Sequence, residues 1–189
     1  VLYLEGSRTH DMRLVRGVKN RYGSSTEVGI FEMAPEGLVE IKNPASFFIK
    51  DRSEAPVGSC LVMTMEGSRP LVLEVQALTN PTVFGYPKRT ASGFDVNRLQ
   101  LLLAVLQKHL GVNVGAQDVY VNVVSGYRLN DPACDLGLCL AILSSFYKKA
   151  LARDAVAIGE VSLSGEIRAP KEVKRREKEI AKFSPQKRF

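Results

Sequence analysis

The sequence contains no tryptophan, only two histidines and only three cysteines among its 189 residues. The cysteines, Cys60, Cys134 and Cys139, are odd in number and form no C-x-x-C pair, and His10 and His109 lie far apart in the sequence. This scarcity argues against a disulfide-bonded scaffold and against a zinc site. We therefore expect buried, reduced thiols and no bound metal in this chain.

Long apolar runs are also missing. The longest, at 99–106, is interrupted by Gln100 and flanked by Arg98 and Lys108, and it is much shorter than the roughly 20 residues that a bilayer-spanning helix needs. We expect no transmembrane segment and no membrane partner. The first residues, 1–6, contain neither an initiator Met nor a basic signal region, and they begin within an apolar pattern, so we interpret the chain as an internal piece of a longer protein.

What is present is the composition of a globular protein. Hydrophobic residues make up 45% of the chain and charged residues 24%, with a mean hydropathy of -0.04. These values exclude a disordered, collagen-like or coiled-coil chain. The length fits one complete domain and part of a second.

Positive charge is concentrated at one end of the chain. The formal net charge of +6 arises within residues 168–189, which hold nine Lys or Arg and three Glu, whereas the rest of the chain has equal numbers of basic and acidic side chains. A terminal segment of this kind suits a polyanionic partner. From charge alone, a solvated helix face with ordinary Glu–Lys pairs explains it equally well.

Strand patterns dominate the first fifty residues. The predicted elements are strands at 1–5 and 12–18, a polar loop at 19–25, a hairpin of strands 27–33 and 38–41, and a short helix-like piece at 45–49. The polar segment 50–56 is the best candidate for a domain boundary.

Strands and helices are mixed in the remainder, which predicts an α+β fold. The expected elements are a hairpin of 59–66 and 71–78, a helix at 95–110 capped by Asp95 and ended by Gly111, a strand at 119–124, a helix at 132–149, short strands at 155–158 and 161–167, and a helix at 171–183. In the last helix, Val173 and Ile180 share one face, so the basic residues of the other faces are predicted to point outward. These are Lys174, Arg175, Lys178 and Lys182.

Eight stretches spread over nearly the whole chain form one recognisable set. They are VLYLEG at 1–6, LVRGVKNRYGS at 14–24, EVGIFEM at 27–33, MEGSRP at 65–70, EVQAL at 74–78, KRT at 88–90, GFDVNR at 93–98 and GEVSLSGEIR at 159–168. Together they resemble the RadA/Sms family of DNA-repair ATPases. The KNRYG block at 19–23 is close to the signature of that family, with Tyr22 where Phe is usual.

The resemblance implies a domain organisation. Members of this family have a zinc-binding N-terminus, a RecA-like ATPase core and a C-terminal domain shaped like the peptidase domain of Lon. Residues 1–50 would be the C-terminal part of the core, and residues 51–189 a Lon-protease-like domain of the ribosomal protein S5 domain 2-like type. No G-x-x-x-x-G-K-[ST] motif occurs in the chain, so ATP and Mg are expected to bind mainly to the core upstream of Val1, and this chain alone should not hydrolyse ATP.

The resemblance also assigns a role to the basic loop. In such proteins this loop is implied to reach across a subunit interface to the nucleotide of the neighbouring subunit, where cations at the end of a strand could neutralise charge on the transferred phosphoryl group. From the loop sequence alone, an exposed basic loop without a partner is the alternative. The residues concerned are Lys19, Asn20, Arg21, Tyr22 and Gly23.

A Lon-like fold raises the possibility of a Ser–Lys peptidase, which the sequence can test. Lon enzymes carry their nucleophile in a Gly-Pro-Ser-Ala-Gly turn that opens a helix, with a later Lys as general base. Here the equivalent stretch is 131–135, DPACD, so Ala133 stands at the position of the nucleophile, and Lys174 lies near that of the base. Cys134 is one residue away and would face another direction. We therefore expect a scaffold and binding module without peptidase activity.

The resemblance implies a hexameric, ATP-dependent DNA translocase and branch-migration helicase of recombinational repair. Its expected partners are single- and double-stranded DNA, further copies of itself and a RecA-type recombinase. Its expected location is the cytoplasm in a bacterium and the plastid or mitochondrial matrix in a eukaryote. The candidate phosphate contacts form two sets, one of Lys88, Arg89 and Arg98 and one of Lys174, Arg175 and Arg176. For Arg98, a role at the interface between subunits of the ring is the alternative. A pure oligomerisation module that does not touch DNA remains the alternative for the whole domain.

Overall fold

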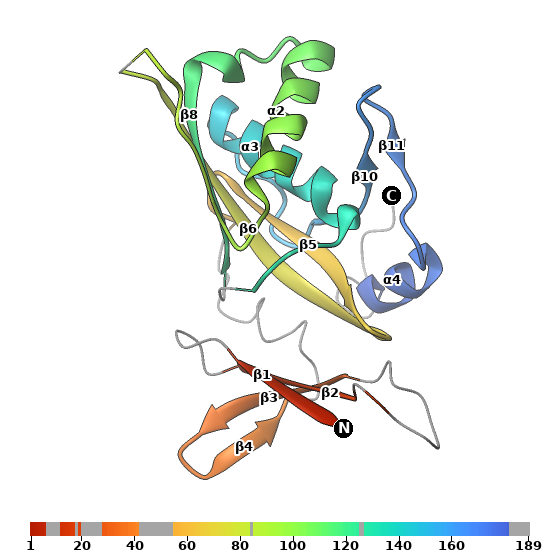
Figure 1. Cartoon of the computed structure of the whole chain (residues 1–189). Helices are drawn as coiled ribbons and strands as arrows, with labels where there is room; N and C mark the ends of the chain where they lie inside the picture. Colours follow the sequence, from red (N-terminus) through yellow and green to blue (C-terminus); the bar gives the residue numbers. More distant parts are fainter. Residues whose placement is uncertain are drawn as a thin grey trace.

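The computed structural model describes residues 1–6, 12–17, 19, 28–41, 55–83, 85–124 and 127–181 (Figure 1). It is an α+β structure with one four-stranded sheet, one five-stranded sheet, a small two-stranded hairpin and helices on both faces of the larger sheet. The α+β part of the predicted fold class is therefore confirmed.

The N-terminal sheet is an antiparallel meander in which each strand pairs with the next along the chain. Its strands are β1 (Leu2–Gly6), β2 (Met12–Gly17), β3 (Val28–Ala34) and β4 (Gly37–Glu40), as the apolar runs predicted. Leu14, Val28 and Ile30 are buried on this sheet. The predicted helix at 45–49 and most of the boundary at 50–56 lie outside the described residues.

The larger sheet has the order β7-β8-β6-β5-β9. Its strands are β5 (Ser59–Glu66), β6 (Arg69–Pro81), β7 (Arg89–Ser92), β8 (Gln117–Val123) and β9 (Val156–Ala157). The β5–β6 hairpin and β8 pair antiparallel, whereas the edge strands β7 and β9 pair parallel with their neighbours. Strand β7 was not predicted from the sequence, because the residues RTAS show no apolar alternation. The extended state of β7 depends on its pairing with β8.

Two helices cover one face of this sheet (Figure 1). Helix α2 (Val96–Leu110) begins at Asp95, whose side chain accepts a hydrogen bond from the backbone N of Arg98 at 2.7 Å, and ends at Gly111 with a φ of 65°. Both predicted caps are confirmed. Helix α3 (Asp135–Tyr147) follows a 3-10 turn, η3 (Pro132–Cys134), so the predicted helix at 132–149 has an irregular first turn. A second 3-10 turn, η1 (Val114–Ala116), connects α2 to β8.

The strand predicted at 161–167 is wrong. Instead β10 (Glu160–Val161) and β11 (Ile167–Arg168) form a short antiparallel hairpin. Between them the chain turns tightly, because Gly165 adopts a φ of 82° and the backbone N of Glu166 donates to Ser162 Oγ at 3.2 Å. The Ser and Gly residues of this turn overrode the apolar alternation.

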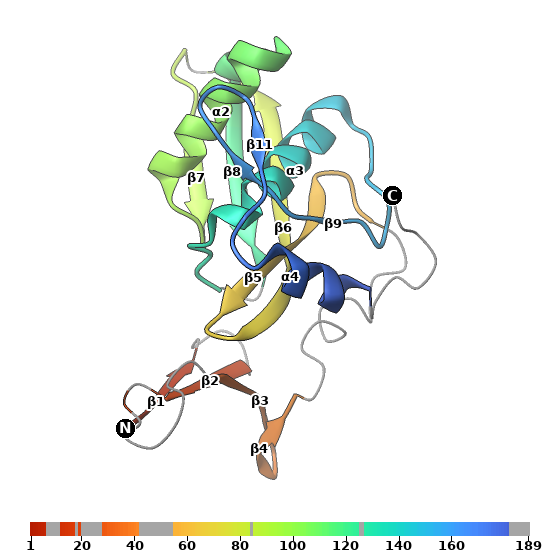
Figure 2. The same ribbon diagram turned by 90° about the vertical axis from the view of Figure 1, so that its right-hand side faces the viewer.

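Helix α4 (Val173–Ile180) lies on the other face of the sheet, beside the β5–β6 hairpin (Figure 2). Its Ile180 packs against the buried Leu61, Met63 and Val72. Lys182, which we predicted to point outward, lies outside the described residues. No helix in the described part of the chain is both long enough and apolar enough to span a bilayer.

Candidate functional site

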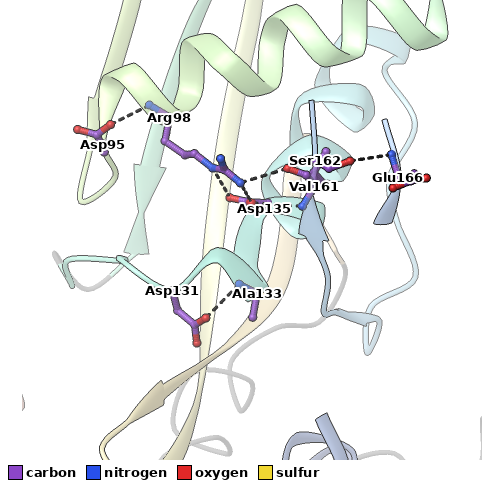
Figure 3. Close-up of polar contacts among 8 residues, drawn as sticks. All are labelled: Asp95, Arg98, Asp131, Ala133, Asp135, Val161, Ser162 and Glu166. Carbon is purple, nitrogen blue, oxygen red and sulfur yellow. Dashed lines mark hydrogen bonds and ion pairs between the residues drawn. The ribbon is translucent and has the colours of Figure 1, made fainter. Parts of the chain in front are cut away.

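Asp131 organises the polar contacts at the start of η3 and α3 (Figure 3). Its Oδ1 accepts a hydrogen bond from the backbone N of Ala133 at 3.0 Å, which caps the turn. Its Oδ2 accepts one from the backbone N of Met65 at 3.1 Å. One carboxylate therefore ties the entry of α3 to the end of β5.

Arg176 completes this network from α4. Its side chain is only 3% exposed, and its Nη1 and Nη2 donate to Met63 O at 2.5 Å and Asp131 Oδ2 at 2.6 Å. Its Nε donates to Lys171 O at 3.2 Å. The guanidinium is thus engaged inside the protein, and the sequence-based assignment of Arg176 as a DNA contact stays a prediction.

Arg98 forms a second internal network (Figure 3). Its Nε and Nη2 bind the two carboxylate oxygens of Asp135, which is buried, and its Nη2 also donates to Val161 O at 3.2 Å. The hydrogen bond to Asp135 raises the pKa of Arg98 and outweighs the opposing effect of burial. Arg98 therefore links α2, α3 and β10, and about a third of its side chain remains exposed.

Ala133, the residue that the resemblance aligns with the Lon nucleophile, has no reactive group. Ala133 is fully buried. The serines farther along α3 are hydrogen-bonded to backbone: Ser144 Oγ accepts from Gly58 N at 2.9 Å and donates to Lys149 O at 2.6 Å. These contacts fasten α3 to the sheet, and within the described part of the chain they include no basic side chain that could activate either serine.

Cys134 is no substitute nucleophile either. Its Sγ donates to Met63 O at 3.6 Å, and burial raises its pKa well above the ordinary value, with the charge of Asp131 adding to the effect. Burial likewise raises the pKa of Cys139 to about 12. Cys60 is also buried, and all three cysteines are buried thiols outside any disulfide, as predicted.

We predict that iodoacetamide at pH 8 modifies none of these cysteines in the folded protein. A thiol with a pKa of about 12 has only about one thiolate in ten thousand molecules at this pH. Mass spectrometry of intact protein should show no adduct in native buffer and three in 6 M guanidinium, which serves as the control. Rapid native modification of Cys134 would contradict its burial and restore it as a candidate nucleophile.

Lys88 and Arg89 lie at the β7 edge of the larger sheet. The Arg89 guanidinium donates to the backbone oxygens of Gln117, Lys88 and Val114, the last at 2.9 Å, and burial lowers its pKa, partly opposed by the nearby Asp118. The backbone N of Lys88 donates to Asp118 Oδ1 at 2.8 Å, which lowers the pKa of that carboxyl. Arg89 therefore anchors the loop, whereas the Lys88 side chain is exposed.

Of the basic loop at 19–23, only Lys19 is described. Its backbone N and O bond with the O and N of Val1, at 3.4 and 2.7 Å, and its side chain is exposed. Asn20, Arg21, Tyr22 and Gly23 lie outside the described residues.

Helix α4 carries the largest basic group that the described residues present to solvent on one element. Lys174, Arg175 and Lys178 are exposed, as predicted. Arg175 forms an ion pair with Glu172 at 3.5 Å in which both side chains are about half exposed, so the pair contributes roughly 0 to 1 kcal/mol and leaves the cation accessible.

Sequence reasoning missed the residues that hold this region together, Asp131 and Asp135. Asp131 precedes a Pro at the start of a predicted helix, which is an N-cap signal, and that signal could have identified its capping role. No local pattern marks Asp135 as the buried partner of Arg98, 37 residues earlier in the chain.

Comparison with known proteins agrees with the resemblance. No protein-family model matches the chain. It is 50% identical over 183 residues to DNA repair protein RadA of Halalkalibacterium halodurans, and this alignment covers 97% of the chain and 40% of the relative. It is 47% identical to the RadA proteins of Bacillus subtilis and Streptococcus pneumoniae over the same share of the chain, and over 40% and 44% of those relatives. The chain thus spans about two fifths of the length of the curated relatives it matches. On this identity over nearly its whole length, the chain belongs to the RadA/Sms family of DNA repair proteins.

Proposed function

We propose that this chain is the DNA-contacting, peptidase-inactive part of an ATP-driven DNA translocase that acts in recombinational repair. In this proposal residues 51–189 form a Lon-protease-like domain, and residues 1–50 are the end of a RecA-like core. Single- and double-stranded DNA are the proposed ligands. The names of the relatives, which are bacterial DNA repair proteins, support this role and a cytoplasmic location.

The observation that carries the proposal is that two neighbouring arginines on α4 differ in exposure: Arg176 is buried, whereas Arg175 is exposed. Arg176 is buried and clamps the helix to Asp131 and Met63. Next to it, Arg175 and the exposed lysines of the same helix face solvent. A rigidly held cationic face suits phosphates, which attract positive charge whatever the base sequence. Lys88, on the exposed loop at the β7 edge, is a second proposed contact.

Apart from Lys19, the rest of the proposed motor lies outside the described residues. ATP and Mg would bind to the core upstream of Val1, and the loop containing Lys19 and Arg21 would reach the nucleotide of a neighbouring subunit in a hexameric ring. A RecA-type recombinase is the proposed protein partner. Lys19, exposed and paired through its backbone with Val1 at the end of the N-terminal sheet, is compatible with such a role.

A second candidate function, an oligomerisation module that does not touch DNA, is favoured by exposed apolar side chains. Leu110, Tyr147 and Leu163 are each more than half exposed, and Tyr86 is 88% exposed. Apolar side chains of this kind are typical of protein–protein contacts where they form a continuous patch.

DNA binding by the chain distinguishes the two candidates. We predict that Lys174→Gln/Arg175→Gln/Lys178→Gln weakens binding to single- and double-stranded oligonucleotides of any sequence. The slope of log K against log salt should flatten by about 2 to 3 units, since each lost phosphate contact removes about 0.7 to 0.9. Fluorescence anisotropy over a series of salt concentrations measures both effects.

The matched control is Lys108→Gln/Arg128→Gln/Lys149→Gln, which removes the same number of Lys and Arg charges from exposed positions elsewhere. Equal losses in the two triple variants would indicate diffuse attraction without a defined interface. If the unmodified chain binds no DNA even at low salt, the oligomerisation module becomes the better account.

A further inference from the structure

A polar recess lies where three distant parts of the chain meet. It has a volume of about 530 Å³ and lies between the start of β3, the β5–β6 turn and the exposed side of α4. Figures 1 and 2 show how these three elements are arranged. Its lining residues are Val28, Ser68, Arg69, Pro70, Arg175, Lys178 and Glu179. Neither of the two basic sets chosen from the sequence includes Arg69 or Lys178.

The recess is rich in positive charge. Three cations, Arg69, Arg175 and Lys178, line it together with one carboxylate, that of Glu179, and one hydroxyl, that of Ser68. Arg69 Nη1 donates to Val28 O at 3.3 Å, which uses one of the five N–H groups of the guanidinium and orients the rest. The lining therefore offers several donors and an excess of positive charge to an anion.

The walls of this recess are held in place independently of any ligand. The β5–β6 turn has two loop residues, and the first, Gly67, has a φ of 54°, in the position that a type II′ hairpin turn reserves for glycine. The opposite wall, α4, is clamped by the buried Arg176 and by the packing of Ile180. Binding an anion here would cost little ordering of the protein.

We infer that this recess binds a phosphate group. Arginine presents planar, paired donors that match phosphate, and two arginines with a lysine supply the charge that phosphate requires. Two sources could supply this phosphate group: a phosphodiester of DNA and free inorganic phosphate. In taking DNA as the source, the inference rests on the proposed function. Arg69 thereby becomes part of the phosphate-binding surface although it lies outside the basic helix.

The test uses the full chain, inorganic phosphate and a single-stranded oligonucleotide as two separate probes. In ¹H–¹⁵N correlation spectra, we expect both probes to shift the amide signals of Ser68, Arg69, Arg175 and Lys178 in a saturable way. Arg69→Gln and Lys178→Gln should each weaken oligonucleotide binding and flatten the salt slope by about 0.7 to 0.9. Arg69→Lys, which keeps the charge but not the paired donors, should keep the salt slope and recover only part of the affinity, and the matched control Lys108→Gln should behave like the unmodified chain.

The outcomes separate this inference from the proposed function. Saturable shifts with either probe support the phosphate site, and shifts with phosphate but none with DNA identify the free ion as the source and count against the DNA role. If DNA binds and shifts only residues outside the recess, the phosphate site is wrong while the proposed function stands. If neither probe shifts these amides and no DNA binds, both are wrong. Should Arg69→Gln fail to fold, the exposed Lys178→Gln carries the same test.

Discussion

Replacing Asp131 with alanine is expected to destabilise the protein by about 3 to 5 kcal/mol, the usual cost of removing one partner from a buried ion pair. The change leaves the guanidinium of Arg176, 3% exposed, without its counter-charge. It also removes the cap of η3 and the hydrogen bond from Met65 N. Urea unfolding followed by circular dichroism measures the loss as a lower midpoint.

Two further variants separate the buried charge from general effects of the substitution. Glu166→Ala breaks the exposed ion pair with Arg168 and should cost no more than about 1 kcal/mol. Asp131→Ala/Arg176→Met removes the stranded cation as well and should be more stable than Asp131→Ala alone. A double variant that is even less stable than the single one would contradict the role assigned to the buried charge.

Gly93→Ala is the second substitution for which we expect a large effect. Gly93 has a φ of 74°, and a Cβ there would lie 2.5 Å from Tyr127 O and 2.8 Å from Val123 Cβ. The left-handed conformation costs about 1 to 2 kcal/mol for a non-glycine residue. Displacing the neighbouring backbone and side chain adds about 1 to 3 kcal/mol. Because Gly93 lies two residues before Asp95, the N-cap of α2, the damage should reach the Arg98–Asp135 network.

Gly85→Ala is the matched control, because Gly85 has nearly the same φ, 75°, but no atom within 4 Å of the added methyl group. It should show only the conformational cost. Thermal unfolding of the two variants compares them directly, and the difference between their free energies of unfolding measures the steric clash. Equal destabilisation would mean that the contacts around Gly93 relax freely.

The two internal networks meet at the start of α3. Ala133, which the family resemblance aligns with the Lon serine, lies between two carboxylates, those of Asp131 and Asp135, that are both engaged by arginines. These ion pairs join α2, α3, α4 and β10 into one unit. Through the Asp131–Arg176 pair, this region fixes the position of the basic helix α4.

Several elements could be predicted from the sequence because local signals specify them. Helix α2 has both a capping Asp and a terminating Gly around a helical apolar repeat, and each was found where predicted. The β5–β6 hairpin joins two mainly apolar runs across a Gly-containing turn, and the central part of β5 is buried on both faces. Strand β7 and the β10–β11 hairpin were not predicted correctly, because pairing with other parts of the chain and a tight turn outweighed their weak local preferences.

The sequence by itself determined the family, the α+β class, the alanine at the nucleophile position and the outward orientation of Lys174, Arg175 and Lys178, since motifs, periodicity and residue identity are local properties. Only the tertiary structure decided which arginines are available to a ligand. Arg176 and Arg175 are adjacent and identical in charge, yet one is buried against Asp131, 45 residues earlier in the chain, and the other is exposed beside Arg69 in the recess. The physical reason is that the accessibility of a charge depends on which distant carboxylates and carbonyl groups the fold brings within hydrogen-bond distance.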